Sequence, residues 1–255
     1  MGERALAWRV ERACFNAWPA LEDLPIGDWM ARSGRGLYRR TNSANPLKAR
    51  PRRIDASIAT LEAIYGGWRM PAIFRVPSIV DPSLDGRLDR LGYRLEGETL
   101  TLFGALADLK DCVDQRVEIL ETPGAVWLAA KASLSDLSPQ QADTYRDVIA
   151  SLALPAAFAA LWIDGRIASL AYAARHRGLL VIEGVVTAGP QRGKGLARRM
   201  LSTLLASKVA AGCKAACLQV QADNIAALKL YGGLGLTTEL YRYHYRREDH
   251  SASRD

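Results

Sequence analysis

The sequence predicts an α+β fold in which a mixed, largely antiparallel sheet is flanked by helices. Three apolar stretches follow one another with only short polar turns between them, at residues 156–163, 166–175 and 179–187. Such closely spaced strands are typical of an antiparallel meander and not of a series of parallel crossovers. Segments with helical periodicity lie on either side of this meander, and a chain of 255 residues is long enough for two domains.

The composition is that of a globular protein. Hydrophobic residues make up 49% of the chain and charged residues 24%. No apolar stretch approaches the roughly 20 residues that a membrane-spanning helix requires, so no membrane partner is expected. Residues 1–15, MGERALAWRVERACF, include acidic side chains and lack the apolar core of a secretory signal. A cytoplasmic location is therefore expected.

The four cysteines and three histidines are too scattered to predict a metal site or a disulfide framework. Cys213 and Cys217 flank a predicted buried strand, so packing is their simplest role. No metal is expected. The net charge of +7 permits an anionic partner but does not require nucleic acid, and the oligomeric state is not indicated.

The amino-terminal half alternates between helices and strands. The predicted elements, in order, are a helix at 3–17, a strand pair within 27–43, a helix at 54–65, a strand at 72–78, a short helix at 83–91 and a closing strand at 94–104. Polar turn formers at 132–140 then interrupt the periodic pattern. The apolar residues 126–130 just before this break are interpreted as either a strand or a docking segment.

The carboxy-terminal half contains the meander and a long helix. The predicted elements, in order, are a helix at 139–151, the three meander strands with a tight turn at Asp164-Gly165, a helix from about 195 to 211 that ends at Gly212, a strand at 214–221, a helix capped by Asp223 and a strand at 236–247. One face of the long helix is apolar: Leu196, Met200, Leu201, Leu204, Leu205 and Val209. In the last strand the tyrosines alternate with polar residues, as in a half-buried strand: Tyr241, Tyr243 and Tyr245.

The segment between the third meander strand and the long helix carries the clearest chemistry. Gly193 and Gly195 allow the backbone to approach a ligand closely, with their amides at the positive end of a helix dipole. Arg192 and Lys194 add full charges at the same place, which predicts a pyrophosphate site. The spacing fits neither a nucleotide P-loop nor a dinucleotide fingerprint, which needs a third glycine where Arg198 stands.

Two motifs in this half resemble the GNAT acetyltransferase superfamily. The segment from Arg192 to Ala197 matches the R/Q-x-x-G-x-G/A signature, in the family's position before the long helix. After the next strand, the family's N-x-x-A-x-x-x-Y-x-x-L-G pattern is reproduced by Asn224, Ala227, Tyr231, Leu234 and Gly235. The resemblance covers residues 138–247. It implies an enzyme that moves an acetyl group from acetyl-CoA, its cosubstrate, to a primary amine by direct attack.

The resemblance also implies where the cofactor binds. The pantetheine arm would add to the edge of the third meander strand, at Val185, Val186 and Thr187, as a form of β-augmentation. The pyrophosphate would rest on the loop residues Arg192, Gly193, Lys194, Gly195, Leu196 and Ala197. Asn224 is similar to the family residue that reaches the pantetheine, although it could also simply cap a helix.

For catalysis, the resemblance implies a proton donor near the sulfur and a base for the amine. Tyr231 occupies the family's position near the sulfur and is the candidate general acid, with a core aromatic as the alternative. Some family members carry a glutamate where this chain has Gln219, which cannot accept a proton. Glu183 is the substitute candidate for the base, with an ordinary strand or salt-bridge role as the alternative.

The amino-terminal half resembles the first half of tandem GNAT proteins, in the stretch WMARSGRGLYRRTNSANPL and a later Y-x-x-W-x-x-P-A-I-F-R pattern. It lacks the phosphate loop, because Pro46 and Pro51 stand where the paired glycines would be. The predicted organisation is a degenerate GNAT-like domain at 1–120, a linker at 121–137 and a catalytic domain at 138–255.

A basic run in the amino-terminal half contains no acidic residue. Its members are Arg32, Arg35, Arg39, Arg40, Lys48, Arg50, Arg52 and Arg53. A solvated basic face is the ordinary interpretation, and a contact with acidic acceptors or with the coenzyme's phosphates is the sharper one. Two other functions stay open, a non-catalytic acetyl-CoA sensor and a nucleic-acid-binding protein that uses this run.

Overall fold

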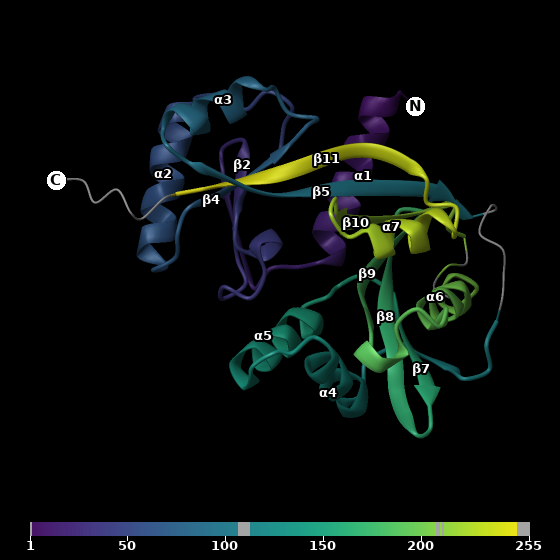
Figure 1. The fold of residues 1–255 in the computed structure, drawn as a ribbon. Helices are drawn as coiled ribbons and strands as arrows, with labels where there is room; N and C mark the ends of the chain where they lie inside the picture. The colour runs from purple at the N-terminus through teal and green to yellow at the C-terminus, as the bar shows by residue number, and fades with distance from the viewer. Residues whose placement is uncertain (1, 107–112, 208–209, 211, 249–255) are drawn as a thin grey trace. The chain divides into compact units, whose positions relative to one another are not determined.

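The computed structural model describes residues 2–106, 113–207, 210 and 212–248, and the chain divides into two compact units. Unit 1 contains Met1–Pro19 and Thr101–Leu240, and unit 2 contains Ala20–Leu100 and Tyr241–Asp255. Both units combine strands with helices, which confirms the predicted α+β class (Figure 1).

Unit 1 contains the predicted meander. Its elements, in chain order, are α1 (Glu3–Ala17), β6 (Val117–Leu120), α4 (Ala125–Leu134), α5 (Pro139–Ala150), β7 (Ala156–Ile163), β8 (Arg166–His176), β9 (Leu179–Thr187), α6 (Leu196–Leu205), β10 (Ala215–Gln221) and α7 (Ile225–Gly232). Each of the strands β6 to β9 pairs antiparallel with the next one along the chain, and β10 pairs with β9 in parallel. The β7–β8 turn places Asp164 and Gly165 at φ values of 48° and 72°, as a tight hairpin requires.

Helices cover both faces of the sheet in unit 1. Figure 1 shows α4 and α5 on one side of β8 and β9 and α6 on the other. Under α4, Trp127 packs edge-on against Phe158, which stacks on Tyr172. The hydroxyl of Tyr172 donates to Ala17 O at 2.7 Å and so ties α1 to the same face. This aromatic core fixes the strands on which the candidate site is built.

Unit 2 contains the remaining strands and two helices. Its elements are β1 (Glu22–Ile26), β2 (Trp29–Ser33), β3 (Ala44–Pro46), α2 (Ile54–Gly67), β4 (Ile73–Pro77), α3 (Ser83–Arg90) and parts of β5 (Arg94–Ala105) and β11 (Thr238–Arg247). The strand order is β1-β2-β3-β4-β11-β5. β3 meets β4 in parallel, and β11 pairs antiparallel with β4 from Tyr243 opposite Pro77 to Arg247 opposite Ile73.

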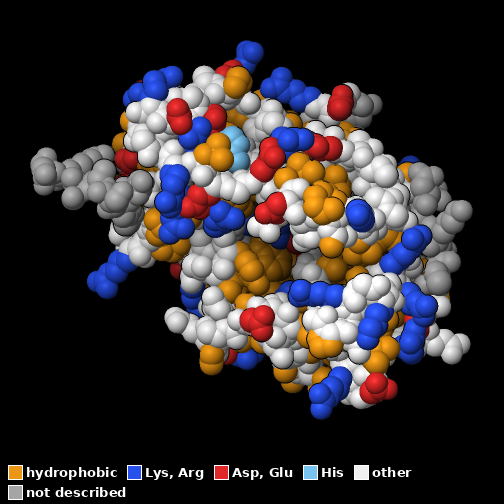
Figure 2. All heavy atoms as spheres, in the orientation of Figure 1, with side chains coloured by type: hydrophobic (Ala, Val, Ile, Leu, Met, Phe, Trp, Pro, Cys, Tyr) orange, Lys and Arg blue, Asp and Glu red, His pale blue; other side chains and the backbone are white. Residues whose placement is uncertain are grey.

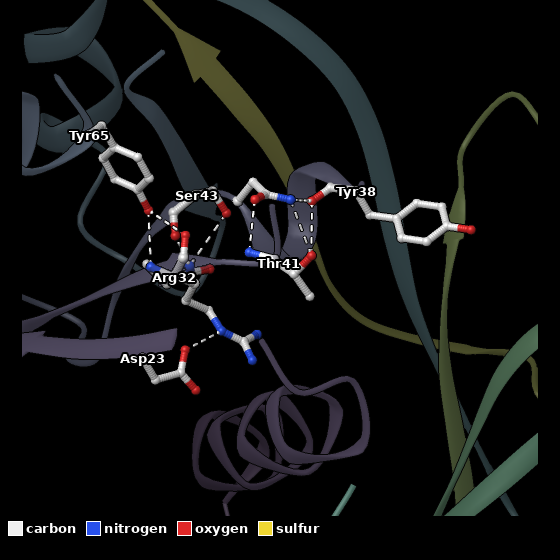
Figure 3. Close-up of polar contacts among 9 residues, drawn as sticks. Asp23, Arg32, Tyr38, Thr41, Ser43 and Tyr65 are labelled. Carbon is white, nitrogen blue, oxygen red and sulfur yellow. Dashed lines mark hydrogen bonds and ion pairs between the residues drawn. The ribbon is translucent and has the colours of Figure 1, made fainter. Parts of the chain in front are cut away.

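One arginine of the basic run belongs to the core of unit 2. Arg32 on β2 is only 1% exposed, and its Nε donates to Asp23 Oδ1 at 2.9 Å (Figure 3). The hydroxyl of Tyr65 on α2 accepts from Arg32 N and donates to Arg32 O, both at 3.0 Å. Burial lowers the pKa of Arg32, an effect that the charge of Asp23 opposes. Arg32 therefore ties β1, β2 and α2 together and is no part of a solvated basic face.

The two halves of the chain repeat one order of elements. β3–α2–β4 and β9–α6–β10 are both strand–helix–strand crossovers with parallel strands. The next helices, α3 and α7, are each followed by a Leu-Gly pair, with Gly92 at a φ of 83° and Gly235 at 84°. Glycine adopts this left-handed conformation without strain, which lets β5 and β11 begin directly after the helices. The repeat matches the tandem arrangement predicted from the sequence.

The compact units do not coincide with the predicted domains at 1–120 and 138–255. Unit 1 includes α1 from the start of the chain, and unit 2 includes the end of β11. The predicted linker at 121–137 contains α4, so the strand interpretation of 126–130 was wrong. Its apolar residues follow a helical spacing that buries Trp127.

Three smaller elements also differ from the prediction. Of the strand pair expected within 27–43 only β2 lies in that range, and its antiparallel partners β1 and β3 lie before and after it. Strand β6 had no predicted counterpart. The helix expected to reach residue 211 ends at Leu205 among the described residues, and Val209 lies outside them.

Candidate active site

The candidate site begins where β9 and β10 part. The two strands pair only from Leu179 opposite Ala215 to Val181 opposite Cys217. The six residues of β9 beyond Val181 therefore have no ladder with β10, although β8 still pairs with them on the other edge. Backbone groups of β9 that face away from β8 can accordingly pair with a ligand.

A bulge shapes this part of β9. Leu170 of β8 pairs with Val186 and Tyr172 pairs with Glu183, so two β9 residues lie opposite one β8 residue. Gly184 forms the bulge with a φ of 68°, and a Cβ there would lie 3.6 Å from the hydroxyl oxygen of Tyr145. From Gly184 onward β9 is half-buried, whereas its earlier residues are fully buried. The bulge thus marks the start of the accessible part of the strand.

The predicted phosphate loop follows β9 directly. Gly193 and Gly195 have φ values of 76° and 75°, and a Cβ at either would meet no atom within 4 Å. Both glycines are exposed, and Gly195 is the N-cap of α6. Leu196 is buried as the first residue of α6, and Ala197 is half-buried. The loop therefore presents backbone N–H groups to open space at the positive end of a ten-residue helix.

Positive side chains surround this loop. Arg192 Nε donates to Thr187 O at 3.2 Å and Lys194 Nζ donates to Gln191 Oε1 at 3.0 Å, so both hydrogen-bond to neutral groups. Arg199, one turn into α6, lies 3.7 Å from the carboxylate of Asp114. Among the residues that the structure describes, Arg192 and Lys194 form no ion pair. Their charge is available to an anion.

Helix α7 borders the same region. Asn224 is its N-cap, and its Oδ1 accepts from Ala227 N at 3.1 Å, so the prediction that Asp223 caps the helix was wrong. Asn224, and not Asp223, is the cap because it lies three residues before Ala227, the spacing at which an N-cap side chain accepts from a backbone N–H. At the other end of α7, a Cβ at Gly233 would lie 3.4 Å from Arg198 Nη1 of α6. The end of α7 therefore lies beside the first turn of α6.

The two predicted catalytic side chains are buried in unit 1. Tyr231 on α7 is 7% exposed, and Glu183 on β9 is 6% exposed. Burial raises the pKa of Tyr231, and the negative charge of Glu183 raises it further. The phenol and the carboxylate are thus within electrostatic range of each other. The sequence prediction named both residues but gave no sign that they interact.

Lys131 on α4 is a further polar residue at this site, and the sequence prediction missed it. Its Nζ donates to Gly184 O at 3.1 Å, at the bulge of β9. The signal in the sequence was a lysine four residues after Trp127, which places both side chains on one face of a helix. Because 121–137 was interpreted as a linker, that face was not considered.

The corresponding loop of unit 2, before α2, is built differently. Asp28 is buried, and its Oδ2 accepts from Arg52 N at 3.0 Å and from Arg52 Nε at 3.3 Å. Lys48 Nζ lies 2.6 Å from Asp28 Oδ1. Hydrogen bonding from Lys48 and Arg52 lowers the pKa of Asp28 to about 2. A carboxylate of the chain itself therefore accepts from the backbone N–H of Arg52, just before the N-cap of this helix.

Other members of the basic run are paired as well. Arg39 contacts Glu96 at 3.1 Å, and Arg50 lies 3.6 Å from Asp81. On the face that Figure 2 displays, acidic side chains are set among the Lys and Arg side chains. The run is therefore largely neutralised inside unit 2 and does not form a uniform basic surface.

The described residues offer neither a cluster of metal ligands nor a membrane-spanning helix. No group of three or more His, Cys, Asp or Glu side chains among them could hold a metal ion. None of their helices is both long enough and apolar enough to cross a bilayer.

Comparison with known proteins gives a family and a fold. A family model described as "Probable histone acetyltransferase Rv0428c C-terminal" matches residues 7–246. A protein of Bacillus subtilis (strain 168) called "Uncharacterized N-acetyltransferase YobR" is 23% identical over 242 residues, which cover 93% of this chain and 97% of that protein.

Solved structures with the same fold include a GCN5-related N-acetyltransferase from Kribbella flavida, at a TM-score of 0.69 and 15% identity over 98% of this chain and 97% of that one. A tandem GNAT protein from the clavulanic acid biosynthesis pathway matches at a TM-score of 0.65 and 13% identity, over 84% of this chain and 76% of that one. At these identities the likeness concerns the fold, and it agrees with the predicted mixed sheet flanked by helices.

Proposed function

We propose that this chain transfers an acetyl group from acetyl-CoA to a primary amine. The chain belongs to the family described as "Probable histone acetyltransferase Rv0428c C-terminal" and so to the GNAT superfamily. The observation that carries the proposal is the combination, in unit 1, of an open strand edge with a glycine loop at its end. The two are joined directly, because Arg192 Nε donates to Thr187 O. A ligand with a peptide-like arm and a pyrophosphate would use both.

Acetyl-CoA has these two parts in the required order. Its pantetheine arm carries amide groups that can pair with the β9 backbone at Val185, Val186 and Thr187, as an added strand would. Its pyrophosphate would accept from the amides of residues 193–197, with Arg192 and Lys194 balancing the charge. Since Asn224 uses its side-chain oxygen as a helix cap, we expect its side-chain NH2 group to contact the arm.

The transfer requires a polarised thioester carbonyl, a neutral amine and a proton donor for the leaving thiolate. We expect backbone N–H groups of β9 beside the bulge at Gly184 to stabilise the developing oxyanion, since the ladder is irregular there. Tyr231 suits the role of donor, because its raised pKa keeps the phenol protonated at neutral pH. As the C–N bond forms and the C–S bond breaks, the phenol gives its proton to sulfur and the attacking nitrogen loses one. Glu183 is the base that the sequence suggests.

The acceptor is the least constrained part of the proposal. A small-molecule amine, a protein amino terminus and a lysine side chain all meet the chemical requirement, since each offers a primary amine. A nucleic-acid function has less support. The tyrosines of β11 are buried and cannot stack on bases, and Arg32, Arg39, Lys48, Arg50 and Arg52 pair with carboxylates of unit 2.

Mass spectrometry of acetylated products tests the proposal. The chain would be incubated with acetyl-CoA and, in turn, with spermidine, a peptide with a free amino terminus, and a lysine peptide with a blocked amino terminus. We expect acetylation of at least one probe, above the level without enzyme. If acetyl-CoA binds but none of the three classes is acetylated, the protein is a sensor of acetyl-CoA and the enzymatic proposal is wrong.

A further inference from the structure

Lys131 places a charge where an apolar side chain would be expected. It lies on the face of α4 that packs on the sheet, one turn after the buried Trp127, and only 6% of it is exposed. Removing an ammonium group from water costs free energy unless strong partners compensate. Charges that are buried at such a cost are concentrated at functional sites. The position of Lys131 beside the bulge of β9 therefore calls for a chemical explanation.

The contacts of Lys131 place its amine at the candidate reaction centre. Its Nζ donates to the carbonyl of Gly184 at 3.1 Å and lies 5.6 Å from the ring centroid of Tyr145. Gly184 is the residue at which β9 becomes accessible and leaves its regular ladder with β8. The backbone N–H groups assigned to the thioester carbonyl come from the same bulge. An amine that attacks this carbonyl must therefore approach close to Lys131.

We propose that Lys131 is the general base that takes a proton from the ammonium group of the acceptor at the bulge of β9. The inference rests on the proposed acetyl transfer. Neutral Lys131 accepts one proton, and the acceptor becomes a neutral amine whose lone pair forms the C–N bond. The C–S electron pair leaves with sulfur, which takes a proton from Tyr231, and the nitrogen of the new amide returns one to the phenol. Lys131 then releases its proton to solvent.

The surroundings favour the neutral form that this role needs. Burial lowers the pKa of Lys131 to about 8, although the charge of Glu183 opposes the effect. At pH 7.5 such a lysine is neutral in about one molecule in four, against roughly one in a thousand for a lysine with its ordinary pKa. The charge of Glu183 thus keeps the pKa of Lys131 from falling further. In this scheme Glu183 tunes the base Lys131 and takes no proton from the acceptor amine.

Several other groups interact with Lys131 itself or with Glu183, whose charge acts on Lys131. Tyr145 of α5 faces it with its ring, and Tyr231 of α7 responds to the same carboxylate of Glu183. On the α1 side, Cys14 has its pKa raised by a hydrogen bond with Cys217, by burial and by nearby charges that include Glu183 and Glu11. Burial raises the pKa of Tyr231, so this phenol stays protonated near pH 8. Lys131 is therefore the group expected to titrate there.

Two substitutions separate a base from a structural lysine. Lys131→Arg keeps the positive charge and the N–H donors for Gly184 O but not the ability to give up a proton, whereas Lys131→Met lacks the charge, the donors and the proton. We expect both variants to bind acetyl-CoA and to lose about 100-fold or more of kcat/KM. The wild-type rate should rise with pH through an apparent pKa near 8, and the variants should lack this rise. Lys229→Arg, on the exposed side of α7, is the matched control and should keep the wild-type profile.

A direct titration tests the same idea without an acceptor. With 13C-labelled lysine, the NMR signal that disappears in Lys131→Met should titrate near pH 8, and the spectrum of Lys229→Arg should keep this signal. A Lys131 signal that titrates above pH 10, or a Lys131→Arg variant with the wild-type rate and pH profile, would overturn the proposal. If no amine is acetylated although Lys131 titrates near 8, acetyl transfer itself has failed. The two failures are thus distinguishable.

Discussion

Two loops of this chain lie between a strand and a helix in the same kind of crossover, yet they handle negative charge in opposite ways. The loop before α6 has exposed glycines at 193 and 195 and two cations that, within the described part of the chain, hydrogen-bond only to neutral groups. The loop before α2 has Pro51 and Arg53 near the corresponding place, and the carboxylate of Asp28 accepts from Arg52 N. One loop is open to an anion and the other already contains one.

This difference explains why a count of basic residues misleads. Unit 2 carries the basic run, but its own carboxylates neutralise much of that charge. Unit 1 has fewer cations at the α6 loop, but two of them, Arg192 and Lys194, have no acidic partner among the described residues. An anion site therefore depends on which charges are left unpaired and on backbone that a ligand can approach, not on the density of arginine.

The largest effect should come from closing the open loop. Gly195→Glu introduces a side chain and a negative charge into the space assigned to pyrophosphate, so we expect acetyl-CoA affinity to fall by at least about 100-fold, a loss of roughly 2.7 kcal/mol. The increase in melting temperature on adding acetyl-CoA should disappear. Arg53→Glu makes the matching change at the N-cap of α2 and should leave that increase intact. Equal responses of the two variants would abolish the distinction between the loops.

The next effect concerns chemistry and not binding. Tyr231→Phe removes the proposed proton donor while it keeps the aromatic ring, so kcat should fall by about 100-fold. The KM for acetyl-CoA should change little, because the phenol acts on the leaving sulfur. Steady-state kinetics with the best acceptor amine would measure both. An unchanged kcat would return Tyr231 to the role of a core aromatic.

A smaller effect is expected from the cations beside the open loop. Replacing Arg192 and Lys194 together by Ala should weaken acetyl-CoA binding by about 10-fold at low salt, and the loss should shrink as salt screens the charges. Replacing Lys48 and Arg52 in unit 2 should not alter binding, because these cations serve Asp28. Titrations at two salt concentrations would test this pair of variants. A matching loss in both would show that unit 2 also contributes to binding.

The smallest effect concerns the stability of the filled loop. The pKa of Asp28 is lowered to about 2 from 3.8, so its ionised form stabilises the fold above about pH 4, and this contribution is lost as the pH falls towards 2. Asp28→Asn should therefore lower the melting temperature at pH 7 by a few degrees. The gap between variant and wild type should narrow progressively below pH 4. A gap that stays constant with pH would contradict the internal-anion account.

Much of unit 1 could be predicted because its signals are local. The meander follows from apolar runs and short turns, and the exposed glycine loop before α6 follows from Gly193 and Gly195. The spacing of one motif named Asn224 and Tyr231 as candidate site residues, and their proposed roles stay predictions. Each of these signals lies within a few residues of the element that it defines.

The remaining features depend on contacts between segments far apart in sequence. Asp28 meets Arg52 across 24 residues, and Lys131 meets Gly184 across 53. The chain segments that make up each unit could not be predicted either, because β11 pairs with β4 although more than 160 residues separate them. Periodicity and spacing do not report such contacts, so the filled loop and the buried lysine required the structure.

The most direct test of the account is the number of acetyl-CoA molecules that one chain binds, measured by isothermal titration calorimetry. We predict one molecule per chain, because the α6 loop is open and the α2 loop contains Asp28. The same titration of Gly195→Glu should show no binding. Two molecules per chain, or one that persists in Gly195→Glu, would contradict the central claim that the two loops differ in this way.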